Sequence, residues 1–156
     1  MISVLFVCMG NICRSPMAEA VFGELVKQAG LSGHFQIDSA GVSNYHIGDL
    51  PHPGTRRILS SRGIQTECTA RQVTPADLRE ADYIVAMDRE NLSDLSDMAR
   101  RLGLSKPFHL LLDFAEDPPV WDVPDPYYTG DFEGTYRLVE AGCQGLLAHI
   151  RQEHEI

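Results

Sequence analysis

The chain has 156 residues, of which 44% are hydrophobic, and a formal net charge of −9. This length and composition predict one domain, residues 1–156, that is large enough to bury a core. The negative charge argues against binding to nucleic acid or to anionic membranes, and no apolar run approaches the roughly 18 residues of a membrane span. Four cysteines without zinc-ligand spacing and without a preceding leader sequence lead us to expect no metal, no cofactor, a cytoplasmic location and a monomer.

Apolar runs alternate with amphipathic segments along the whole chain. The predicted elements in chain order are a strand at 2–7, a helix at 16–29, a strand at 34–38, a loop at 42–53, a helix at 55–62, a helical turn after Thr74-Pro75, a strand at 83–87, a helix at 89–102, a strand at 109–113, a loop at 115–130 and a last helix capped by Asp131. This alternation predicts a single-domain α/β fold, a doubly wound parallel sheet of four strands in flavodoxin-like order with helices on both faces.

Three polar or reactive residues directly follow predicted strands. Cys8 comes after the first strand, Ser39 after the second and Asp88 after the third. The carboxyl ends of parallel strands meet at one edge of the sheet, where ligands bind in such folds. We therefore expect these residues to lie close together.

The segment from Cys8 to Pro16 reads as a strand end, a short loop and a helix start. Ser15 is a good N-cap and Pro16 suits the first helical position. Free backbone N–H groups at that helix end form an anion site, which would stabilise the thiolate of Cys8. Arg14 adds a two-pronged donor for phosphate oxygens, so the segment indicates attack of sulfur on a phosphoryl group. A small buried cysteine and a surface salt bridge are the simpler readings of these two residues.

The same segment resembles a known family. Cys8, five residues, then Arg14 and Ser15 is similar to the loop of cysteine-dependent phosphatases, and the string C-M-G-N-I-C-R-S-P-M-A-E-A resembles the low-molecular-weight protein tyrosine phosphatases. Further matching pieces are Asp38-Ser39-Ala40-Gly41, Ala70-Arg71-Gln72, Met87-Asp88 and Asp125-Pro126-Tyr127-Tyr128. The resemblance covers nearly the whole chain and implies metal-independent hydrolysis of phosphotyrosine in protein substrates through a phosphocysteine.

The resemblance also implies roles for individual residues. Cys8 would be the nucleophile, Arg14 would bind two phosphate oxygens, and Asp125 would be the general acid, because a phenol with a pKa of about 10 needs a proton donor to leave. The residues expected to form the phosphate-binding loop, which would also hold inorganic phosphate or analogue anions, are Met9, Gly10, Asn11, Ile12, Cys13 and Ser15. Gly10 and Asn11 would shape the loop backbone, since they best tolerate unusual conformations.

Other site residues keep two interpretations. Asp125 lies among several acidic residues and is singled out only by the Pro-Tyr-Tyr that follows it. Tyr45, Tyr127 and Tyr128 either line a slot for an aromatic substrate or pack structurally. Cys13 is either a packed loop residue or a resolving thiol that traps oxidised Cys8, which would make the enzyme redox-sensitive.

Two positions around the loop bear on specificity and loop support. In related protein-arginine phosphatases the position that matches Ile12 is a Thr. Ile12 therefore favours phosphotyrosine over phosphoarginine as the substrate. Ser39 and Asp88 would support the loop by hydrogen bonds. Relatives often have a His just before the Ala-Arg-Gln segment, in the region where this chain has Cys68, which puts the surroundings of Asn11 in question.

Several other functions compete with phosphatase activity. Arsenate reduction on the same fold needs a relay of further thiols, and Cys68 and Cys143 are not a close pair. A non-catalytic phosphotyrosine-binding module would not need Cys8, Arg14 and an acid together. A protein-arginine phosphatase is a further alternative. A nucleotide-binding loop is excluded, because Gly10 is not followed by Gly-Lys-Ser/Thr.

Overall fold

The computed structural model describes residues 1–156 and is built on one four-stranded sheet. The strands are β1 (Ile2–Cys8), β2 (Phe35–Gly41), β3 (Tyr83–Ala86) and β4 (His109–Leu110). Their order is β2-β1-β3-β4 and every neighbouring pair is parallel. The predicted fold class, a doubly wound parallel sheet in flavodoxin-like order, is confirmed.

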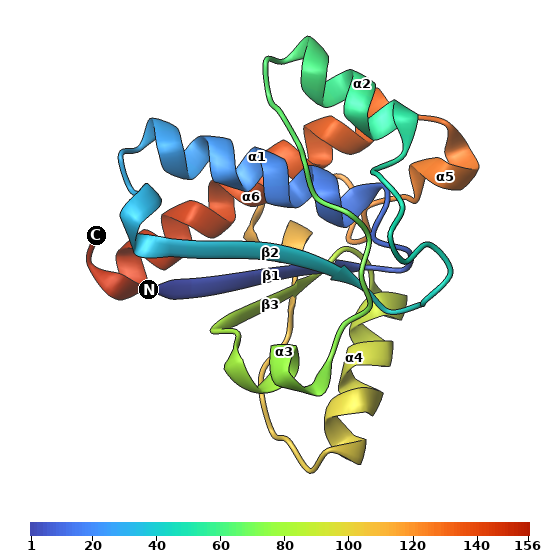
Figure 1. Ribbon diagram of the computed structural model, residues 1–156. Helices are drawn as coiled ribbons and strands as arrows, with labels where there is room; N and C mark the ends of the chain where they lie inside the picture. The colour runs from blue at the N-terminus through green and yellow to red at the C-terminus, as the bar shows by residue number, and fades with distance from the viewer.

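Helices cover both faces of this sheet (Figure 1). They are α1 (Arg14–Gln28), α2 (Pro53–Ser61), α3 (Pro75–Glu80), α4 (Arg89–Arg101), α5 (Pro126–Thr129) and α6 (Phe132–His154), with 3₁₀ turns η1 (Ser32–His34) and η2 (Leu111–Phe114). The helices α1 and α6 lie on one face, and α3 and α4 lie on the other. None of these helices has the length and apolar character that crossing a bilayer requires.

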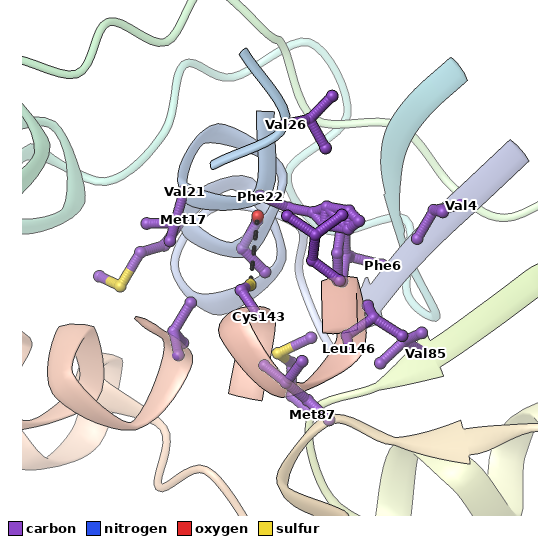
Figure 2. Packing of buried hydrophobic residues seen from close by; sticks show 14 of the residues in the cluster. Val4, Phe6, Met17, Val21, Phe22, Val26, Val85, Met87, Cys143 and Leu146 are labelled. Carbon is purple, nitrogen blue, oxygen red and sulfur yellow. Dashed lines mark hydrogen bonds between the residues drawn. The ribbon is translucent and has the colours of Figure 1, made fainter. Parts of the chain in front are cut away.

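The central strand β1 supplies both cores because its side chains alternate between the two faces. Val4 and Phe6 belong to the larger apolar cluster with α1 and α6, whereas Leu5 and Val7 belong to the smaller cluster with α3 and α4. Phe6 packs beside Phe22 of α1 (Figure 2). Their ring centroids are 5.6 Å apart. Burial on both faces explains the continuous apolar run of the first strand.

The start of α1 differs from the prediction. The helix begins at Arg14, its N-cap residue is Cys13, and no side chain caps it. The prediction of Ser15 as N-cap is therefore wrong, because the Ser15 hydroxyl is held inside the loop by Asn11. The predicted end is confirmed, since the helix ends at Gln28 and Gly30 has the positive φ of +71° that stops it.

The strand ends also differ from the prediction. β2 extends to Gly41, so Ser39 lies within the strand and not after it, because the strand stays paired with β1 up to Cys8. β4 has only two residues, and Leu111–Phe114 turn into η2. Leu111 and Leu112 are fully buried in the cluster with α6, and an apolar run of this length does not distinguish a strand from a buried turn.

Candidate active site

The loop after β1 lies where the chain order of the sheet reverses, between β1 and β3. This is where doubly wound folds bind ligands. A cavity of about 400 Å³ opens there. Its lining residues are Cys8, Met9, Gly10, Ile12, Cys13, Arg14, Ser43, Tyr45, His46, Asp125, Tyr127 and Tyr128.

The loop backbone wraps around the Cys8 sulfur. Asn11 has a φ of 58°, in the left-handed region that asparagine tolerates, and its backbone N–H donates to Cys8 Sγ at 3.3 Å. The segment that follows β2 contacts the same loop, because Ser43 N donates to the Met9 carbonyl at 2.9 Å. A Cβ on Gly41 would lie only 2.9 Å from Met9 O, so the absence of a side chain allows this close approach.

Side chains from α1 and β2 complete the surroundings of the sulfur. Ser15 Oγ lies 3.0 Å from Cys8 Sγ. The Asn11 amide nitrogen donates to Ser15 Oγ at 2.8 Å and to Ser39 Oγ at 3.0 Å. Ser39 in turn donates to Glu19 at 2.6 Å. A hydroxyl hydrogen bond to sulfur stabilises a thiolate, both as a nucleophile and as a leaving group.

Arg14 is a buried cation beside the sulfur, with only 2% of its surface exposed. Its guanidinium donates to Asp88 at 2.6 Å and to the Val123 carbonyl at 3.0 Å, and lies 3.4 Å from Asp125. Burial works against its charge, but Cys8 and the two carboxylates outweigh this and raise the pKa of Arg14. Its Nε has no hydrogen-bond partner within the protein, so a donor remains for a bound anion.

Asp88 and Asp125 each bind Arg14 and also cap a helix. Asp88 Oδ1 accepts from Asn91 N at 2.7 Å at the start of α4. Asp125 Oδ1 accepts from Tyr127 N at 3.0 Å and begins α5, which leaves Oδ2 on the Arg14 side. Arg14 and Asp125 are 111 residues apart in the sequence, and the fold brings both to the cavity.

The three predicted slot tyrosines line the cavity and are exposed at its mouth. Tyr45, Tyr127 and Tyr128 are 81%, 54% and 83% exposed, and the rings of the last two meet edge to face with centroids 5.2 Å apart. His46 also lines the cavity, with its ring 6.3 Å from that of Tyr127 and its Nδ1 3.2 Å from Asp49. His46 was not predicted from the sequence, and its position next to Tyr45 was the only available indication.

The remaining cysteines have different surroundings. All four are free thiols. Cys13 lines the cavity, and its burial, together with Asp125 and Cys8, raises its pKa to about 12. Cys68 lies 3.4 Å from the Thr66 hydroxyl, and Cys143 donates to the Ala18 carbonyl inside the core (Figure 2). Cys68 and Cys143 do not line the cavity.

Hydrogen bonds hold Asn11 on both sides. Its side-chain oxygen accepts from the backbone N–H of Arg71 at 3.0 Å, while its nitrogen bonds Ser15 and Ser39. The Asn11 side chain therefore keeps hydrogen bonds at both its oxygen and its nitrogen, although this chain has Cys68 in the region where relatives often have a His. Glu19, which ends the chain of hydrogen bonds through Ser39, was not found from the sequence, because a glutamate on an amphipathic helix reads as a solvated residue.

Comparisons with known proteins agree with this geometry. Residues 3–156 match the family described as low molecular weight phosphotyrosine protein phosphatase. The low molecular weight protein-tyrosine-phosphatase YfkJ of Bacillus subtilis is 52% identical over the full length of both chains, and its crystal structure superposes with a TM-score of 0.94, covering 98% of this chain and 96% of that one.

Two more distant relatives extend the comparison. The low molecular weight phosphotyrosine protein phosphatase of Sus scrofa is 40% identical, with 96% of each chain covered. A Drosophila arginine phosphatase is 33% identical, with a TM-score of 0.89 over 95% of this chain and 97% of that one. The chain therefore belongs to the low molecular weight phosphotyrosine protein phosphatase family.

Proposed function

We propose that residues 1–156 form a single phosphatase domain that hydrolyses phosphotyrosine in protein substrates through a phosphocysteine intermediate. The observation that carries this proposal is that Cys8, Arg14 and Asp125 line one cavity at the carboxyl end of the sheet. They are a sulfur nucleophile, a buried bidentate cation and a carboxyl group, which are the groups that transfer of a phosphoryl group to sulfur requires.

In the first step the Cys8 thiolate attacks phosphorus and forms the P–S bond. The bond from phosphorus to the tyrosine oxygen breaks, and its electron pair goes to that oxygen, which receives a proton from the Asp125 carboxyl group. Arg14 and the loop N–H groups bind the non-bridging oxygens, and the unpartnered Nε of Arg14 supports this role.

In the second step the Asp125 carboxylate takes a proton from a water molecule, whose oxygen attacks phosphorus. The P–S bond breaks, sulfur leaves as the Cys8 thiolate and inorganic phosphate is released. Ser15 Oγ, 3.0 Å from Cys8 Sγ, is placed to donate to that departing thiolate. Ser39 and Asp88 hold Asn11 and Arg14 in place for both steps.

Phosphotyrosine suits the shape of the cavity. Tyr45, Tyr127 and Tyr128 at its mouth offer aromatic surface to a phenyl ring, and the depth of such a slot selects against the shorter phosphoserine. Phosphoarginine is the second candidate, because one of the similar structures is a Drosophila arginine phosphatase. Ile12 in the cavity wall favours phosphotyrosine, since an apolar side chain offers no hydrogen bond to a guanidinium.

The positions of the thiols argue against arsenate reduction. That reaction needs further thiols near Cys8, but Cys68 and Cys143 lie outside the cavity. Cys13 does line it, and its role as a resolving thiol for oxidised Cys8 stays a prediction. Four free thiols favour a reducing compartment, so we propose a cytoplasmic enzyme, which we expect to be a monomer without cofactor or metal.

The test is release of inorganic phosphate from phosphotyrosine, phosphoserine and phosphoarginine peptides in the presence of a chelator. We expect turnover of the phosphotyrosine peptide, complete loss in Cys8→Ser, and a loss of about 10²–10⁴-fold in Asp125→Ala. Cys68→Ser and Glu116→Ala are the controls, because they remove a thiol and a carboxylate that lie outside the cavity.

The proposal fails if the wild type releases phosphate from none of the peptides, or if Cys8→Ser stays active. Faster turnover of phosphoarginine than of phosphotyrosine would instead identify an arginine phosphatase. Tight binding of the phosphotyrosine peptide without turnover would identify a binding module.

A further inference from the structure

An unbroken chain of hydrogen bonds links a carboxylate on α1 to the sulfur of the active-site cysteine. Ser39 Oγ donates to Glu19 Oε1 at 2.6 Å, and Asn11 Nδ2 donates to the hydroxyls of Ser39 and Ser15 at 3.0 and 2.8 Å. Ser15 Oγ lies 3.0 Å from Cys8 Sγ. We propose that Glu19 is a positioning residue that fixes the direction of these hydrogen bonds, and so keeps the Ser15 proton directed at the Cys8 sulfur.

Glu19 sets the donor and acceptor roles in this series of hydrogen bonds. An ionised carboxylate only accepts hydrogen bonds, so the single hydroxyl proton of Ser39 must point to Glu19. The lone pairs of Ser39 Oγ then face Asn11, which must present its NH₂ group to them. The carboxylate thereby excludes the opposite arrangement, in which Ser39 donates to the Asn11 oxygen, because two oxygen lone pairs would then face each other across 2.6 Å.

The direction continues through Asn11 to the sulfur. The backbone N–H of Arg71 donates to Asn11 Oδ1 at 3.0 Å, which favours the same orientation of the amide. The second hydrogen on Asn11 Nδ2 goes to Ser15 Oγ, so the proton of Ser15 remains for Cys8. If the amide were reversed, the Ser15 hydroxyl would face an acceptor oxygen and its proton would turn away from the sulfur.

On balance, the surroundings of Glu19 disfavour its negative charge. Burial raises the pKa of Glu19, the hydrogen bond from Ser39 lowers it, Asp38 raises it and Arg71 lowers it. Cys68 is the remaining titratable group whose charge is coupled to Glu19. Because burial opposes this charge, a neutral residue of the same shape is expected to leave folding intact.

The inference rests on the proposed function, since it concerns the sulfur that would attack phosphorus and later leave. A test that needs no phosphate ester separates the two. The rate at which iodoacetamide alkylates Cys8, with the modified residue located by mass spectrometry, is measured against pH, because only the thiolate reacts. Cys13, with a pKa of about 12, reacts little in the same range.

Glu19→Gln preserves shape but adds a donor that permits the reversed arrangement. We expect the midpoint of the alkylation profile to rise by about one pH unit, because one pH unit corresponds to about 1.4 kcal/mol and a hydrogen bond to a charged group contributes about that much. Removing a negative charge by itself would move the midpoint in the opposite direction. Glu24→Gln is the matched control: it removes a carboxylate from the same helix that bonds only Gln28, and is expected to leave the midpoint unchanged.

A double-mutant cycle tests whether Glu19 acts through the chain. Without the hydroxyl of Ser39, residue 19 cannot influence the orientation of Asn11. In a Ser39→Ala background Glu19→Gln should therefore no longer raise the midpoint, and only the lowering expected from the lost negative charge remains. An unchanged or lower midpoint in Glu19→Gln, or an equal rise in both backgrounds, overturns the inference. If the wild type releases no phosphate but the midpoints shift as described, the proposed function fails and the assignment of Glu19 stands.

Discussion

Replacing Gly41 with alanine should distort the phosphate-binding loop directly. Gly41 ends β2, and an added Cβ would lie 2.9 Å from Met9 O and 3.1 Å from Asn11 N, which themselves belong to that loop. Gly41 cannot withdraw, because its own N–H is bonded to the Arg71 carbonyl on the opposite side at 2.8 Å. The loop must therefore move by about 0.5 Å to restore an ordinary contact distance of about 3.4 Å.

This displacement sets the size of the effect. A misplacement of about 1 Å in an active site can cost about 10²-fold in rate, so about half of that distance corresponds to roughly tenfold in kcat/KM, or about 1.4 kcal/mol. Overpacking costs about 1–3 kcal/mol of folding free energy, which predicts that Tm falls by roughly 3–10 °C. The assays are phosphate release from a phosphotyrosine peptide and thermal denaturation followed by circular dichroism.

Gly23→Ala is the matched control for Gly41→Ala. Gly23 lies in α1, and a Cβ there meets no atom within 4 Å. Because alanine favours the helix over glycine by about 1 kcal/mol, this variant should keep full activity and gain stability. If Gly41→Ala had kcat/KM within twofold of wild type and an unchanged Tm, the claimed contact between β2 and the loop would be refuted.

Two further predictions concern stability. Gly145→Ala should cost at least about 3 kcal/mol, because its Cβ would overlap the rigid backbone carbonyl of Phe114, and a Tm within about 2 °C of wild type would contradict this. Burial and His149 lower the pKa of His109 from its ordinary value of 6.5. His109 therefore takes up a proton more readily in the unfolded chain than in the folded one, so the protein loses stability as the pH falls below 6.5. In urea denaturation, His109→Gln should lose less stability than wild type between about pH 8 and about pH 5, and equal losses would refute this account.

The helix boundaries show which features local sequence patterns can predict. Thr74 and Asp77 form a capping box at the start of α3, and Asp88 and Asp131 cap α4 and α6. The helical turn after Thr74-Pro75 and the cap by Asp131 were predicted from the sequence. These caps depend on residues within three or four positions of one another, so the sequence contains the whole interaction. Ser15 looked equally suited to a cap, but Asn11 and Cys8 hold its hydroxyl.

The candidate site likewise contains features that local sequence patterns predict and features that they do not. The loop from Cys8 to Arg14 was predicted because its nucleophile, its arginine and the helix N-terminus are consecutive in the chain. The family motif around Asp125 indicated a role for that residue, but its contact with Arg14 across 111 positions required the fold. His46 and Glu19 were missed because nothing in their own segments distinguishes them from exposed polar residues.

The sequence by itself determined the alternation of strands and helices, the parallel sheet and the reactive loop at the end of β1, because each depends on apolar periodicity or on neighbouring residues. The tertiary structure alone decided that Leu111 turns away from β4, that Gly41 presses on the loop, and that Ser39 connects Glu19 to Asn11. These features depend on distances between segments that are remote in the chain. Short-range patterns do not contain such distances, because packing of the whole core sets them.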